Sequence, residues 1–63
     1  LNFAKRLKIL RKKAHLTLRE VADQIGVSLS TIHRWENSHR YPRLNELVRI
    51  ANVFQVPLEQ LIA

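Results

Sequence analysis

The single glycine of the chain, Gly26, lies between two segments whose apolar residues recur every three or four positions. In the segment before it, one helical face carries Leu18, Val21, Ala22 and Ile25. Thr17 and Glu20 have the spacing of a capping box at the start of this helix. Gly26 should end it, because glycine enters the left-handed conformation at low cost, and Ser28 is a favoured N-cap for a second helix over 29–37. The sequence therefore predicts two helices joined by a very tight turn.

The rest of the chain also has the pattern of helices, because one glycine and two prolines are few for 63 residues with 46% hydrophobic content. One face of a first helix is expected to bury Phe3, Leu7, Leu10 and Ala14. A loop is expected over 38–43, and the helix after it, over 44–54, is expected to bury Leu47, Val48, Ala51 and Phe54. Pro57 is expected to open a short fifth helix with Leu58, Leu61 and Ile62. We therefore expect one compact all-α domain of five helices over residues 1–63.

The charge of the chain indicates which classes of partner it can bind. Eleven Lys and Arg against five Asp and Glu give a net charge of +6, which favours nucleic acid or an anionic lipid surface. Six of the basic residues lie between Lys5 and Lys13, where there is no acid. Neither a membrane-spanning run nor a signal peptide is present, so we expect a location in the cytoplasm or on the nucleoid. Because the chain starts at Leu1 and has no methionine, we expect it to be part of a longer protein.

An enzyme is the weakest candidate class. A catalytic site needs a nucleophile, a base and an orienting group that converge, whereas this chain offers only His15, His33 and His39 at scattered positions. The sequence has no cysteine, no glycine-rich phosphate loop and no metal-ligand spacing. We therefore expect no catalytic residue, no metal and no cofactor.

Two helices joined by a short glycine turn are the pattern of the DNA-binding helix-turn-helix, in which the second helix enters the major groove. At about 100° per residue, Ile32 and Trp35 of that helix point one way. The opposite face has no acid and is predicted to read bases through Leu29, Ser30, His33 and Arg34. Arginine can fork onto guanine, and leucine can lie against a thymine methyl group. The alternative is that these polar side chains only face solvent, as on any surface helix.

These segments together resemble the phage-repressor and Cro-like helix-turn-helix family, over Leu7 to Ile62. The similarity rests on pieces that recur in the family's order and spacing: Arg11, residues 17–22, residues 25–28, Ile32, residues 35–37, Pro42, Leu47, Ile50 and Ala51. It implies five helices, sequence-specific binding of double-stranded DNA in transcriptional regulation, and often a homodimer on a palindromic site. It also implies that Ser28 faces the DNA with the base-reading residues and that phosphates are contacted by Thr17, Ser28, Asn37, Arg40 and Arg43.

The chain departs from the family pattern at three positions. The family commonly has Gln at Leu18, where it touches DNA, and leucine cannot make that hydrogen bond. The family usually has Gly at Ser38, so the chain must turn there through a left-handed Asn37 or a strained Ser38. Arg43 stands where Ser or Thr usually caps the next helix, so it is either a weaker cap or a residue kept for phosphate contact.

Two further groups of residues have internal or intersubunit interpretations. Arg11 flanks the apolar face of the first helix and Glu36 that of the third, so the two can pair across the helix packing, which the resemblance also implies. Two solvated charges are the alternative. A homodimer is expected because one small chain cannot readily cover all of Val53, Val56, Leu58 and Ile62.

The sequence thus predicts a DNA-binding domain of a small transcriptional regulator. Two alternatives stay open. One is a DNA-binding antitoxin or another protein-interaction module that uses the same domain. The other is a membrane-surface domain that binds through the basic Lys5–Lys13 helix. The opposing face of that helix has no tryptophan and is needed for the core, which makes lipid binding the less favoured of the two.

Overall fold

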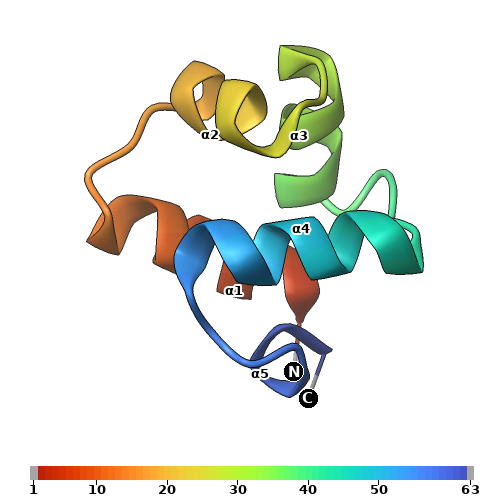
Figure 1. Ribbon diagram of the computed structural model, residues 1–63. Coiled ribbons are helices and arrows are strands. Elements are labelled where there is room, and N and C mark those ends of the chain that lie inside the picture. The colour runs from red at the N-terminus through yellow and green to blue at the C-terminus, as the bar shows by residue number, and fades with distance from the viewer. Residues whose placement is uncertain (1, 63) are drawn as a thin grey trace.

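A computed structural model describes residues 2–62, and over this range the chain is helical with no strand. The five helices are α1 (Phe3–Lys13), α2 (Leu18–Ile25), α3 (Leu29–Glu36), α4 (Leu44–Phe54) and α5 (Glu59–Ile62). In Figure 1, α2 and α3 lie together at one end of the molecule, α1 and α4 cross its middle, and α5 lies at the other end. The all-α fold with a tight turn between α2 and α3 is as predicted.

Polar side chains cap the first three helices at their N-termini. Asn2 Oδ1 accepts from the Ala4 amide at 2.8 Å. Thr17 and Glu20 form the predicted capping box, with bonds of 2.8 and 3.1 Å between each side chain and the other residue's amide. Ser28 Oγ accepts from the Thr31 amide at 3.2 Å. Each cap satisfies an N–H group that the helix itself leaves unpaired, so these local signals fix where the helices begin.

Left-handed residues follow the first four helices. Gly26 has φ of 87°, as predicted, but the same conformation is adopted by His15, Ser38 and Gln55, at φ of 58°, 61° and 55°. At Ser38 this answers the open question, because Asn37 has φ of −108° and the chain turns through the serine. The turn is closed by a bond from the His39 amide to the Arg34 carbonyl at 2.9 Å. For a residue with a Cβ, the left-handed region costs about 1–2 kcal/mol, so the turns at His15, Ser38 and Gln55 are strained and the turn at Gly26 is not.

The core lies where α1, α2, α3, α4 and α5 meet. Its largest fully buried side chains are Trp35, Leu7, Ile32, Ile50, Leu61 and Val21. The predicted buried face of α4 is wrong at Val48, which is 42% exposed, whereas Ile50 is fully buried. Residues 47, 50 and 51 are spaced as one helical face, and Val48 lies a further 100° or so around the axis. Ala14 is exposed as well, because it lies beyond the last turn of α1.

The last helix begins later than predicted. Pro57 does not open α5, which starts at Glu59. Instead, the Gln60 and Leu61 amides bond to the Pro57 and Leu58 carbonyls at 3.0 and 2.9 Å, the spacing of a tighter 3₁₀-type turn. Leu61 is the buried residue of α5, and Ile62 is 50% exposed.

Candidate nucleic-acid interface

Helix α3 has one face inside the protein and one face in solvent. Ile32 and Trp35 are fully buried and Glu36 is 6% exposed. On the other side, the structure places the four predicted base-reading residues together on the exposed face: Leu29, Ser30, His33 and Arg34. No acidic side chain lies between Leu29 and Arg34. The exposed face can therefore donate hydrogen bonds to an electron-rich surface without charge repulsion, which base edges and phosphates both provide.

The hydroxyl groups at the start of α3 are partly occupied. Ser28 Oγ lies 2.8 Å from Thr31 Oγ1 and 3.4 Å from Ser30 Oγ, besides accepting the Thr31 amide. Ser28 can reach a phosphate only with its own O–H, and it has that hydrogen free when Thr31 is the donor of the shared bond. Thr31 was not predicted as a site residue. Its spacing of three from an N-cap serine is the one sequence signal that points to it.

The predicted phosphate contacts lie at helix ends and in the loop after α3. Thr17, Ser28, Asn37, Arg40 and Arg43 are all exposed. Thr17 Oγ1 accepts from the Glu20 amide, which leaves its O–H free to donate. Asn37 is less free, because its Nδ2 donates to the His33 carbonyl at 2.7 Å and so closes the end of α3.

Arg43 caps α4 through its backbone and not through its side chain. Its amide donates to Glu46 Oε1 at 2.8 Å. Arginine has no acceptor, so its side chain makes no reciprocal cap bond. Only the bond from the Arg43 amide to Glu46 is therefore present from the capping box, and the Arg43 guanidinium is available to a partner.

The structure brings Arg11 and Glu36 together in a fork-shaped pair between α1 and α3. Arg11 Nε and Nη2 donate to the two carboxylate oxygens of Glu36 at 2.7 and 3.1 Å, and Nη1 donates to the Leu16 carbonyl at 3.1 Å. The side chains are 15% and 3% exposed. The hydrogen bonds with Glu36 raise the pKa of Arg11 above its ordinary value, against the opposing effect of burial, and the attraction of the carboxylate adds to the rise. One residue thus ties α3 to α1 and to the loop that leads into α2.

Arg49 on α4 is a structural contact that the sequence analysis missed. Its Nη1 donates to the carbonyl of Ile25, the last residue of α2, at 3.0 Å. Helix α2 has no basic residue in its own last turn, so α4 supplies the cation that favours this carbonyl end. A Cβ added at Gly26 would lie 3.3 Å from the same nitrogen. The turn between α2 and α3 is therefore held against α4.

The predicted dimer residues differ in exposure from what was expected. Val53, Val56 and Leu58 are partly buried and pack against the core of their own chain, so these three are better covered than the sequence suggested. Ile62 alone of the four is half exposed. Val53 lies in α4, and Val56 and Leu58 lie in the segment before α5, where helical periodicity does not reveal their contacts with the core.

The described residues form neither a metal site nor a membrane span. Over 2–62, no three side chains of His, Cys, Asp and Glu gather where they could hold a metal ion. Within the same range, none of the helices is both long and apolar enough to cross a membrane.

Comparison with known proteins gives several transcriptional regulators. The chain is 32% identical over 63 residues to the HTH-type transcriptional activator BcrR of Enterococcus faecalis, an alignment that covers 100% of this chain and 31% of BcrR. It is 32% identical over 56 residues to the cryptic phage CTXphi transcriptional repressor RstR of Vibrio cholerae, with 89% of this chain and 50% of RstR covered. It is 35% identical over 57 residues to the HTH-type transcriptional regulator AnsR of Bacillus subtilis, with 90% of this chain and 49% of AnsR covered.

The chain thus spans about a third to a half of the length of these curated relatives. The helix-turn-helix family matches residues 7–61, a range that begins in α1 and ends in α5. It includes the capped α2, the left-handed Gly26 and the two-faced α3 described above. On both the match and the geometry, this chain belongs to the helix-turn-helix family.

Proposed function

We propose that the domain binds double-stranded DNA sequence-specifically, with α3 in the major groove, as part of a transcriptional regulator that works on the nucleoid in the cytoplasm. The observation that carries this proposal is the exposed, acid-free face of α3, backed by the buried Ile32 and Trp35. A helix held rigidly from behind presents its outer side chains at a fixed height and angle, which base reading requires. The names of the bacterial and phage relatives, one an activator and one a repressor, support the same class of function.

Within this proposal, Arg34 reads a base and Arg43 holds the DNA backbone. Arg34 lies on the outer face of α3, about one and a half turns from its start. Arg43 lies in the loop before α4, and no described residue bonds to its guanidinium. Arginine forks onto guanine O6 and N7, while Leu29 offers an apolar surface to a thymine methyl group. Phosphate contacts add affinity without sequence preference and make binding depend on salt.

The experiment compares Arg34→Ala with Arg43→Ala on a duplex selected from random DNA and on a scrambled duplex. Arg34→Ala should cost about 1–3 kcal/mol on the selected duplex only, and it should relax selectivity at one base position. Arg43→Ala should weaken binding to both duplexes and lower the slope of log affinity against log salt by about 0.9. Lys5→Ala, which removes an equal charge from α1, is the matched control and should leave selectivity unchanged. Equal losses on both duplexes for Arg34→Ala would make it a phosphate contact and contradict this assignment.

We also propose that the domain binds as a homodimer on an inverted repeat, through the α4–α5 segment and the exposed Ile62. Half-sites should then lie roughly 34–36 Å apart, one turn of the duplex. Sedimentation of the protein with a selected duplex should give two chains per inverted repeat, and Ile62→Asp should reduce this to one at the same protein concentration. One wild-type chain per inverted repeat would contradict the dimer.

A further inference from the structure

A hollow of about 350 Å³ opens beside α3, on a side of the domain that base reading does not use. We call it the Trp35 hollow. It is lined by loop residues 38–41, by Asn2 and Phe3 at the start of α1, and by Trp35. Its volume lies at the lower end of the range of small-molecule sites, which are mostly apolar with a few convergent polar groups.

Trp35, which lines this hollow, has a covered hydrogen-bond donor without a partner among the described residues. The side chain is fully buried, and its Nε1–H has no acceptor among the described residues 2–62. Buried N–H groups in folded proteins nearly always have a partner, so an unpaired one indicates an acceptor outside the described residues 2–62. The indole can donate but cannot accept, so the missing partner must be an acceptor such as an oxygen atom.

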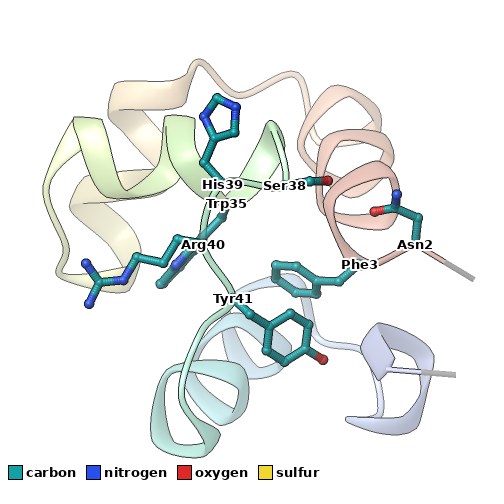
Figure 2. A pocket seen from close by; sticks show the side chains of 7 residues that line it. All are labelled: Asn2, Phe3, Trp35, Ser38, His39, Arg40 and Tyr41. Carbon is teal, nitrogen blue, oxygen red and sulfur yellow. The ribbon is translucent and has the colours of Figure 1, made fainter.

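The surroundings of that donor favour a negatively charged oxygen. None of the seven lining residues is acidic, and Arg40 is among them. In Figure 2 the Arg40 side chain extends past the edge of the indole that carries the nitrogen. Arg40 is exposed and has no hydrogen bond to another described residue, so its guanidinium can turn toward a ligand. Guanidinium groups bind planar carboxylates with two parallel bonds.

The other side of the hollow is aromatic. Phe3 and Tyr41 stack edge to face with ring centroids 5.3 Å apart, and Figure 2 shows the two rings together, across the opening from Arg40. Nε1 itself is covered in this structure. Tyr41 is 58% exposed and Arg40 is exposed as well, so both side chains can move aside and let a ligand reach this nitrogen. A flat apolar body would fit against this pair.

We propose that the Trp35 hollow binds a small carboxylate with a flat apolar body, held by Trp35 Nε1–H and Arg40 at its charged end and by Phe3 and Tyr41 along its ring. Because Arg40 is also one of the proposed phosphate contacts, the ligand competes with DNA for this side chain. This second statement rests on the proposed function, whereas binding of the carboxylate does not. The domain would then sense a metabolite-sized anion at the loop that follows its recognition helix.

Trp35 is the only tryptophan, so a ¹⁵N-labelled sample shows a single indole N–H signal that reports on the hollow directly. Benzoate should move this signal in a saturable titration, and benzyl alcohol, which has the ring without the charge, should not. Arg40→Gln should weaken benzoate binding at least several-fold, whereas Arg43→Gln, outside the hollow, should leave it unchanged. Thermal unfolding of both variants checks that the fold is intact. An unsaturable shift, or equal shifts with benzyl alcohol or in Arg40→Gln, would overturn the proposal.

A second arm tests the link to DNA and separates the two possible sources of the oxygen. Benzoate should lower the affinity of the wild-type domain for its selected duplex and have no effect on Arg40→Gln. If the duplex alone moves the indole signal and benzoate does not, the acceptor is a DNA phosphate and the small-molecule site is overturned. If benzoate binds but DNA affinity stays constant, the competition is overturned and the site stands. If the wild-type domain selects no duplex, the proposed function fails, and the benzoate titration still decides the site.

Discussion

Removal of Arg11 should destabilise the domain more than removal of its partner Glu36. The Glu36 side chain is 3% exposed beside Arg11, so Arg11→Met leaves its carboxylate largely surrounded by protein and without a cation. Breaking a buried pair in this way costs about 3–5 kcal/mol. In Glu36→Gln, the amide oxygen still accepts one bond and Arg11 keeps the Leu16 carbonyl at 3.1 Å, so we expect a loss of about 1.5–3 kcal/mol, the value of hydrogen bonds to charged groups.

The double-mutant cycle isolates the interaction of the two side chains. Arg11→Met should cost less in the Glu36→Gln background, because no buried charge is left behind, and we expect a coupling energy of about 1 kcal/mol or more. The assay is urea unfolding followed by Trp35 fluorescence, with Lys12→Met on the same helix as the charge-matched control. Domains of this size have roughly 3–9 kcal/mol of stability in total, so Arg11→Lys, which keeps the charge and one donor, replaces Arg11→Met if the latter unfolds. A coupling within about 0.3 kcal/mol of zero would refute the reasoning.

Two other substitutions test contacts found in the structure. Ser38→Gly should raise the free energy of unfolding by about 0.5–1 kcal/mol, because glycine adopts a φ of 61° without strain. Ser38→Ala keeps a Cβ and should give no such gain. Equal effects of the two substitutions in chemical denaturation would contradict strain at this residue. Arg49→Met should lower stability by about 0.5–1.5 kcal/mol through loss of its bond to the Ile25 carbonyl, with part of the loss recovered in Arg49→Lys. Arg43→Met is its control in thermal unfolding, because that side chain makes no cap bond, and an equal loss there would argue against a role for the Arg49 contact.

The boundaries of α2 and α3 could be predicted from the sequence because the interactions that set them are local. The Thr17–Glu20 box and the left-handed Gly26 each depend on residues within a few positions of one another. The buried face of α4 could not be fixed in the same way. Its apolar residues cover more than one face, and only packing against the rest of the core decides that Ile50 is buried and Val48 is exposed.

The candidate site likewise has features that helical periodicity predicts and features that depend on contacts between distant residues. The exposed face of α3 follows from helical periodicity once Ile32 and Trp35 are taken as core residues. The contact of Arg49 with Ile25 joins residues 24 positions apart, and no periodicity relates α4 to the end of α2. The unpaired Nε1 of Trp35 is equally invisible, because a sequence shows that an indole has a donor but not whether an acceptor lies within reach.

The hydrogen bonds that hold α3 in place leave its proposed base-reading side chains almost unused. Ser28 caps its start, Asn37 bonds the His33 carbonyl at its end, and Glu36 ties its inner face to α1. None of these bonds involves the side chain of Leu29, His33 or Arg34. The Ser30 hydroxyl makes one long contact, at 3.4 Å from the Ser28 hydroxyl. Substitutions on exposed positions free of such contacts usually change stability by less than about 0.5 kcal/mol. If the outer face of α3 reads bases as proposed, its DNA preference can therefore change almost independently of folding. Asn37 cannot change in this way, because its amide both ends the helix and faces the proposed phosphate path.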